Sequence, residues 1–402
     1  MKARSFRIVA IFAMLVLLLA IWAIGLQAAP EVAAVVQRQE VGRVFSVDFK
    51  SPHPAPASWN ETYTFPGAEF VRLHFSSLDL APGDKLVVSS PDGNQAWEYT
   101  SRGVNGNGDF WSFAIDGDTV QVALSAPSGK SNGFKIVDVG YGTVALDKGT
   151  DVPEVVNDTD GRQPIACHTG EAVVDAAQKP VARLLFTVKR TQYLCTGELI
   201  RGNQDNMLIT NAHCMDNQTE VSTLEARFNY QYTDCAGTVL DTPVSFAGGT
   251  FLKTNSEKYS TRGKNIGGGL DYTLLTLQGS PETTYGELIP TSEDAIVGNW
   301  MNFIQHPAGR PKEIGYWENE NYIDRCDIHT VNMTYGSAAP NSQIGYACDS
   351  EGGSSGSAIT RASDGKVIGL HHYGGVDDGI NSATMMSFIC ADAGNYLDCD
   401  TE

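Results

Sequence analysis

The sequence is short of basic residues and of motifs that bind metals or nucleotides. Its 402 residues include 28 Lys and Arg against 47 Asp and Glu, which gives a formal net charge of −19. A surface that binds nucleic acid needs clustered Lys and Arg, so we expect no nucleic-acid partner. No P-loop, dinucleotide-binding fingerprint or H-E-x-x-H motif occurs, and no two cysteines have C-x-x-C spacing. We therefore expect no cofactor and no metal site.

Long apolar runs are absent after residue 26, but one lies near the beginning of the chain. Lys2, Arg4 and Arg7 precede an apolar run over 8–26, and small residues follow it. This order predicts a secretory signal over residues 1–29. The run of 19 residues is also long enough to span a bilayer, so a retained anchor is the alternative. In both cases the remainder is exported, and we expect a secreted protein that meets a membrane only through a retained anchor.

Cysteine is absent from the first 166 residues, and eight cysteines follow. An even number of cysteines in an exported chain indicates disulfides formed in an oxidising compartment. Their distribution also predicts domain boundaries: a cysteine-free domain over 30–145, a polar linker over 146–163 and a cysteine-containing domain over 164–402. The cysteines are Cys167, Cys195, Cys214, Cys235, Cys326, Cys348, Cys390 and Cys399.

The cysteine-free domain shows the pattern of short strands separated by turns. Residues 70–75 and 119–124 alternate between apolar and polar side chains, and a Pro-Gly-Asp turn lies at 82–84. Short alternating strands separated by turns predict an antiparallel β-sandwich. The run over 65–93 resembles the CUB-like or jelly-roll accessory domains of secreted peptidases, which implies either a pro-domain or an accessory domain. We expect the whole chain to be all-β.

Three short segments in the second domain contain residues for nucleophilic catalysis, in the order His, Asp, Ser. An apolar strand pattern ends at His213, Asp271 opens an alternating strand pattern, and Ser355 lies in a Gly/Ser loop. A serine hydroxyl is a weak nucleophile and needs an adjacent base, and histidine titrates near neutral pH. A buried Asp holds the imidazole in the required tautomer. Glycines in the loop let the N–H groups of Gly353 and Ser355 face one point, as in an oxyanion hole.

A different serine motif overlaps the same loop. Gly352, Ser354 and Gly356 match the G-x-S-x-G nucleophile elbow of α/β-hydrolases. That fold requires an Asp and then a His well downstream, but the later histidines follow Ser354 by only 17 and 18 residues. The β-only pattern also lacks the alternating helices of that fold. We therefore reject this interpretation.

Taken together, the three segments resemble the chymotrypsin-like serine endopeptidases, and among them the bacterial lysyl endopeptidase type. This resemblance implies two packed β-barrels with the triad His213, Asp271 and Ser355 between them, an oxyanion hole at Gly353 and Ser355, and polypeptide substrates. It also implies the disulfides Cys195–Cys214 and Cys167–Cys235, which leaves Cys326–Cys348 and Cys390–Cys399 as the other pairs. The matching segments within about 167–375 also include 195–197, 228–231, 306–307 and 369–371.

The residues expected to form the specificity pocket give conflicting signals. Asp349 lies six residues before Ser355, the offset at which trypsin carries the Asp that selects Lys or Arg. The lysyl endopeptidase type takes its pocket acid from a later loop, where the candidates are residues 377–378, and Gly374 lies just before them. His371 stands where glutamyl endopeptidases carry a His that binds a carboxylate, and Ser350 would suit that pocket.

We expect a monomeric serine endopeptidase that cuts after Lys or Arg. The alternatives are a Glu/Asp-specific endopeptidase of the glutamyl type and a catalytically idle homologue that acts as a binding protein. Ser354 departs from the trypsin pattern, in which an Asp at this position pairs with a newly cut N-terminus. Activation through that pair is therefore not expected here.

Overall fold

The computed structural model describes residues 38–53, 55–145, 153–154, 160–256, 269–335, 338–376 and 380–401. All of these belong to one compact unit, Val36–Glu402. The expected signal or anchor segment, 1–29, and the candidate pocket residues Asp377 and Asp378 lie outside the described residues. Within the described ranges, no helix is both long and apolar enough to cross a bilayer.

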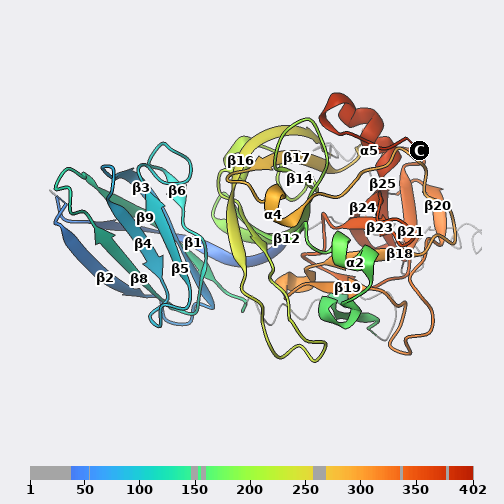
Figure 1. Ribbon diagram of the computed structural model, residues 1–402, viewed down its shortest axis with the longest axis horizontal. Helices are drawn as coiled ribbons and strands as arrows, with labels where there is room; N and C mark the ends of the chain where they lie inside the picture. Colours follow the sequence, from blue (N-terminus) through green and yellow to red (C-terminus); the bar gives the residue numbers. More distant parts are fainter. Residues whose placement is uncertain are drawn as a thin grey trace, which may run out of the picture. The chain divides into compact units, whose positions relative to one another are not determined.

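The N-terminal part consists of two antiparallel sheets that enclose an apolar core (Figure 1). One sheet has the order β1-β9-β3-β6, with β7 also paired to β3, and the other has the order β2-β8-β4-β5. Along β8, Val120, Val122 and Leu124 are buried and alternate with more exposed neighbours, as expected for a strand with one face on the core. The strands are β1 (Gln39–Lys50), β2 (Ser58–Thr64), β3 (Phe70–Asp79), β4 (Lys85–Ser89), β5 (Ala96–Thr100), β6 (Phe110–Trp111), β7 (Ile115–Asp116), β8 (Thr119–Ser125) and β9 (Gly133–Gly142).

The second part begins with a closed six-stranded barrel. Its strands follow the order β12-β15-β16-β17-β14-β13, and pairing between β12 and β13 closes the ring. Buried Leu184, Phe186, Leu208, Phe228 and Leu275 belong to its core. The strands are β12 (Val181–Val188), β13 (Thr191–Leu199), β14 (Met207–Thr210), β15 (Glu225–Phe228), β16 (Val244–Asn255) and β17 (Tyr272–Leu277), with short helices α3 (Gln218–Val221) and α4 (Glu282–Tyr285).

An eight-stranded sheet forms the other half of this part, in the order β11-β19-β18-β23-β24-β25-β21-β20. The all-β fold with two barrel-like sheets confirms the predicted fold class. Its strands are β11 (Arg162–Pro164), β18 (Met301–Gln305), β19 (Glu313–Gly315), β20 (Thr330–Met333), β21 (Gln343–Tyr346), β23 (Ala358–Arg361), β24 (Val367–Val376) and β25 (Ile380–Met385). The helices near it are α2 (Ala172–Ala177), α5 (Met386–Ala393), η1 (Ile165–His168), η2 (Pro307–Gly309) and η4 (Gly394–Tyr396).

Part of the expected linker, 146–163, lies in paired strands. β10 (Pro153–Glu154) pairs with β22 (Ser350–Glu351), and β11 pairs with β19. The side chain of Arg162 is buried, and its guanidinium contacts Asp160 and Glu351. Both strands are thus held against the second part of the molecule. Polar composition does not reveal such pairing with distant strands.

Strand β1 belongs to both parts of the molecule. It pairs with β9 in the sandwich and with β13 in the barrel, so that one eleven-stranded sheet runs through both. A buried charged group reinforces this connection: Oε1 of Glu225 accepts from Nε and Nη2 of Arg227 at 2.9 and 2.7 Å, and Oε2 accepts from the N–H of Ala114 at 2.8 Å. Arg72, on β3, donates to the carbonyl oxygen of Thr223 at 2.8 Å.

Four disulfides are present, and they join the pairs that the resemblance implied: Cys167–Cys235, Cys195–Cys214, Cys326–Cys348 and Cys390–Cys399. This prediction is confirmed, and all eight cysteines are accounted for. All four lie in the second part of the molecule.

Candidate active site

Two paired strands bring His213 and Asp271 together. His213 follows the end of β14 and Asp271 precedes the start of β17, and these strands pair with Thr210 opposite Thr273. Oδ1 of Asp271 accepts from the backbone N–H of His213 at 2.8 Å, and Oδ2 lies 2.7 Å from Nδ1 of its imidazole. The carboxylate therefore holds both the backbone and the ring of His213.

Asp271 is buried, with 2% of its surface exposed, and adopts a left-handed backbone with φ of 48°. Such a conformation is uncommon outside glycine, although Asp and Asn tolerate it best. Burial by itself would raise the pKa of Asp271, but the charges and hydrogen bonds of His213 and His372 outweigh burial and lower it. The carboxylate thus stays ionised and can stabilise a protonated His213.

His372 is a second histidine that contacts Asp271, and it is not among the site residues expected from the sequence. Its Nδ1 lies 3.2 Å from Oδ2 of Asp271, and its Nε2 lies 2.6 Å from Oε1 of Gln343. Both contacts are buried. His372 therefore contacts Oδ2, the same carboxylate oxygen that lies against the ring of His213. The sequence held no local signal for this, because the contact joins β24 to the residue before β17.

The loop that carries Ser355 is held on β13. Thr196 donates through its N–H to the carbonyl oxygen of Ser355 at 2.9 Å and through Oγ1 to that of Gly353 at 2.9 Å. Gly353 and Gly356 have φ of 103° and 90°, which side-chain-bearing residues rarely adopt. At Gly356 a Cβ would also collide with the carbonyl oxygen of Thr196. The glycines in this loop are therefore required by its geometry.

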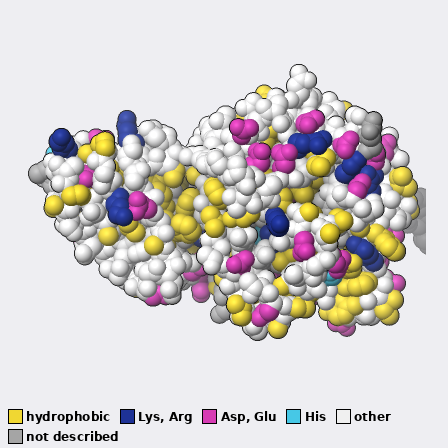
Figure 2. Space-filling model, in the orientation of Figure 1, with side chains coloured by type: hydrophobic (Ala, Val, Ile, Leu, Met, Phe, Trp, Pro, Cys, Tyr) yellow, Lys and Arg dark blue, Asp and Glu magenta, His cyan; other side chains and the backbone are white. Residues whose placement is uncertain are grey.

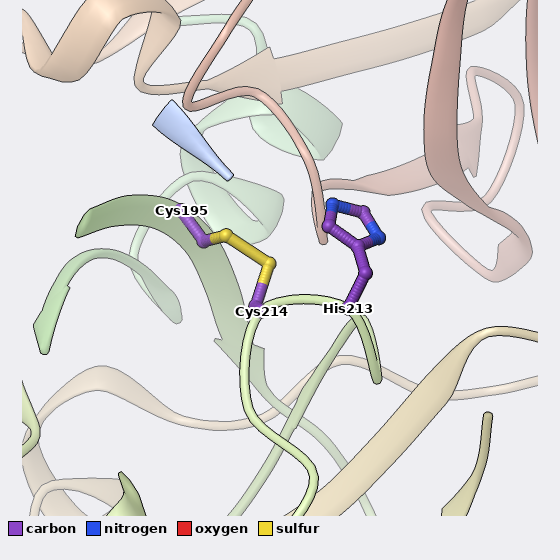
Figure 3. Close-up of side chains that lie close together, drawn as sticks. All are labelled: Cys195, His213 and Cys214. Carbon is purple, nitrogen blue, oxygen red and sulfur yellow. A yellow bond between two sulfur atoms is a disulfide. The ribbon is translucent and has the colours of Figure 1, made fainter. Parts of the chain in front are cut away.

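The Cys195–Cys214 disulfide lies beside His213 and connects β13 to the segment that carries the histidine (Figure 3). The sulfur of Cys214 is also 3.9 Å from the carbonyl oxygen of Ser355. The disulfide and β13 thus bring the His213 segment and the Ser355 loop to the same place. Nε2 of His213, the nitrogen not used by Asp271, is buried and has no hydrogen-bond partner among the described residues.

The expected oxyanion hole lies next to these residues. The N–H of Ala308 donates to the carbonyl oxygen of Gly352 at 2.7 Å, which fixes the peptide unit before Gly353. In the described part of the chain, no backbone hydrogen bond uses the N–H of Gly353 or of Ser355. Ser354 is fully buried, and its hydroxyl donates to Oε1 of Gln305 at 2.5 Å, so that the position of the trypsin Asp serves here as a structural anchor.

The four expected pocket residues differ in their surroundings. Asp349 is fully buried, and its Oδ2 accepts from the N–H of Gly161 at 2.7 Å. Ser350 has a buried hydroxyl that finds no partner among the described residues. Gly374 is half-buried on β24.

The imidazole of His371 is buried and contacts other core side chains. Its Nδ1 lies 2.6 Å from the hydroxyl of Tyr346, and its ring is 4.8 Å from that of Phe303. Burial lowers the pKa of His371 well below the usual value, and the nearby His372 and His213 lower it further. The ring is therefore neutral at physiological pH, which weakens its ability to bind a substrate carboxylate.

Two groups of metal-ligating side chains occur among the described residues. Cys195, His213 and Cys214 form one, but both sulfurs are joined in a disulfide and offer no thiolate. Glu318, Asp327 and His329 form the other, in which Nε2 of the histidine is 2.6 and 3.1 Å from the two carboxylates. These contacts are accounted for by hydrogen bonding at the surface.

The sequence model of the family described as lysyl endopeptidase, C-terminal domain, matches residues 160–384. This range includes the three motifs and the whole of the site described above. The chain belongs to this family. It is therefore a chymotrypsin-like serine endopeptidase, as the resemblance had implied.

Two relatives align over both parts of this endopeptidase. The secreted RxLR effector protein 73 of Plasmopara viticola is 29% identical over 333 residues, which cover 80% of this chain and 79% of that protein. The lysyl endopeptidase of Pseudomonas aeruginosa is 26% identical over 310 residues, which cover 73% of this chain and 63% of that protein.

Solved protease structures align with this endopeptidase at low identity. The active form of the Rv3671c protease from M. tuberculosis is 16% identical, with a TM-score of 0.39 over 60% of this chain and 89% of that one. The HtrA-type protease AlgW with a tripeptide is 15% identical, with a TM-score of 0.39 over 56% of this chain and 63% of that one.

Proposed function

We propose that Ser355, His213 and Asp271 form the catalytic triad of this endopeptidase. The observation that carries the proposal is that Asp271 binds His213 twice: the backbone N–H lies 2.8 Å from Oδ1, and Nδ1 of the ring lies 2.7 Å from Oδ2. The loop with Ser355 is held beside them by hydrogen bonds to β13. The carboxylate presents the imidazole with its proton on Nδ1, so that Nε2 is free to accept one. This is the arrangement that activates a serine hydroxyl.

In the proposed reaction, Oγ of Ser355 attacks the carbonyl carbon of the scissile bond while Nε2 of His213 takes its proton. The N–H groups of Gly353 and Ser355 stabilise the oxyanion, each contributing about 3–4 kcal/mol. His213 then gives its proton to the leaving amine, and the acyl group remains on Ser355. Water activated by His213 hydrolyses this acyl-enzyme, and the free serine is restored.

We propose that the enzyme prefers Lys or Arg before the scissile bond, with Asp349 as the pocket acid. The family match supports this preference, because the matching model is that of a lysyl endopeptidase domain. The second candidate is a preference for Glu or Asp. It is favoured by the buried hydroxyl of Ser350, which has no hydrogen-bond partner among the described residues. The neutral state of His371 argues against it.

We also propose that the protein is exported and acts on polypeptides. Four disulfides fit an oxidising compartment. On the face shown in Figure 2, Lys and Arg side chains are scattered, and several lie next to Asp or Glu. This face therefore has no continuous basic surface of the kind that nucleic acid requires.

The direct test of the triad is labelling with a fluorophosphonate probe, located by mass spectrometry. We expect one adduct, on Ser355, in the folded protein and none after heat denaturation, because only the assembled site activates the hydroxyl. An unlabelled folded protein would support the idle homologue that acts as a binding protein. An adduct on another serine would refute the proposed nucleophile.

Exchange of the pocket acid tests the specificity. In Asp349→Asn, which keeps an acceptor for Gly161, we expect kcat/KM for Lys and Arg substrates to fall by at least about 30-fold, because a buried charge partner is lost. A cleavage profile of a peptide library measures this, with Ser350→Ala as the matched control. Unchanged cleavage after basic residues in Asp349→Asn would exclude it as the pocket acid. Loss of cleavage after Glu in Ser350→Ala would establish the glutamyl preference.

A further inference from the structure

The first residues of β1 lie along the edge of β13 beside the proposed triad. In antiparallel register, Gln39 pairs with Leu194, Glu40 with Tyr193, Gly42 with Gln192 and Arg43 with Thr191. Two residues past Leu194, the N–H of Thr196 binds the carbonyl oxygen of Ser355. A strand advances about 3.3 Å per residue. Leu194, which pairs with Gln39, and Thr196, which binds Ser355, are therefore only about 7 Å apart along β13.

Arg38 anchors this segment on the backbone of the catalytic histidine. Its Nε donates to the carbonyl oxygens of His213 and Cys214 at 2.5 and 3.1 Å. Its Nη2 lies 3.4 Å from the carboxylate of Glu220, and the guanidinium is 5.8 Å from the centre of the Tyr193 ring. We call these four groups the Arg38 pocket. They offer two carbonyl oxygens, one negative charge and one aromatic face, which together select a cation.

The next residue covers the serine loop. The side chain of Gln39 packs against Gly352, where a Cβ would collide with its amide oxygen. Gly352 directly precedes Gly353 of the proposed oxyanion hole. Figure 3 shows the start of β1, in blue, near Cys195. Val41 then enters a buried apolar cluster with Leu185 and Leu194 of the barrel, which fixes the segment in place.

An extended polypeptide can bind a protein by adding a strand to an exposed sheet edge. Here the edge of β13 next to Ser355 is already paired with residues of the same chain. A segment attached to the protein competes at a millimolar effective concentration, which exceeds that of ordinary substrates.

We propose that residues 38–43 are an intramolecular competitor that occupies the leaving-group side of the substrate-binding edge. The Arg38 pocket is then a subsite for a basic side chain just after the scissile bond. This proposal rests on the proposed function, because it takes Ser355 and His213 as the reacting groups. It predicts that polypeptides are blocked, whereas small substrates without a peptide leaving group are not.

The test compares full-chain wild type, Arg38→Ala and the control Lys50→Ala. Lys50 lies at the other end of β1, outside residues 38–43, and its half-exposed ammonium pairs with Asp48. Loss of charge-assisted hydrogen bonds in Arg38→Ala should raise kcat/KM for a polypeptide roughly 10- to 100-fold, with hydrolysis of a small ester unchanged. Lys50→Ala should leave the hydrolysis of both substrates unchanged.

Binding is measured separately, by fluorescence anisotropy of a labelled peptide with the sequence of residues 38–44. We expect it to bind Arg38→Ala, and a peptide with Ala in place of its first Arg to bind at least about tenfold more weakly. Unchanged polypeptide hydrolysis in Arg38→Ala, or an equal change for ester and polypeptide, would overturn the competitor. Peptide binding without hydrolysis of either substrate by any form would support the binding edge and refute the proposed function.

Discussion

Asp271→Asn is expected to lower kcat by about 10⁴-fold while KM changes little. An amide has the shape of the carboxylate, and Asn tolerates the left-handed backbone at this position. However, its NH₂ group would face Nδ1 of His213 and favour the tautomer with the proton on Nε2. That nitrogen could then no longer accept the proton of Ser355. Steady-state kinetics on a small ester substrate measures the loss.

The matched control for this variant is Asp364→Asn. Asp364 is bound to Arg361 near the surface, away from the site, so its exchange should leave kcat unchanged. Thermal unfolding of both variants shows whether either change acts through stability. A loss of less than tenfold in a folded Asp271→Asn protein would mean that Asp271 does not orient the catalytic base.

Glu225→Gln is expected to reduce the free energy of unfolding by about 3–5 kcal/mol. Glu225 is fully buried and binds Arg227 in the barrel and the backbone of Ala114 in the sandwich. Its exchange removes the buried negative charge that pairs with Arg227 and that acts electrostatically on buried Arg72. Chemical denaturation measures the loss. The control is Glu98→Gln, which breaks an exposed pair with Lys85 and should cost at most about 1 kcal/mol.

The same residue gives the protein an acid-sensitive contribution to stability. Burial alone would raise the pKa of Glu225, but Arg227, Arg72 and the N–H of Ala114 lower it. A carboxylate with a lowered pKa stabilises the fold above its unfolded pKa of about 4.3, and this contribution is lost as the pH falls further. When the pH is lowered from 5 to roughly below 4, the free energy of unfolding should therefore fall more in the wild type than in Glu225→Gln. Equal losses would show that Glu225 is not ionised in the folded protein.

The sequence by itself determined the features that short segments encode. Alternation along 119–124 gave a strand with one buried face, and the glycines around Ser355 gave a loop that needs positive φ. The disulfide pairs followed from the resemblance that the three motifs carried. These features depend on backbone preference and side-chain period, which act over a few residues.

Only the tertiary structure decided how distant strands meet. The pairing of β1 with β13 placed Arg38 on the carbonyl oxygen of His213, across 175 positions of the chain. Other long-range contacts put His372 on Asp271 and the N–H of Gly161 on Asp349, and pairing with β22 and β19 placed part of the expected linker in strands. Each of these contacts depends on strand register and on the burial of a polar group against a specific partner. Strand register and polar burial leave no signal in a short stretch of sequence, because the free energy that favours them arises only when the core is assembled.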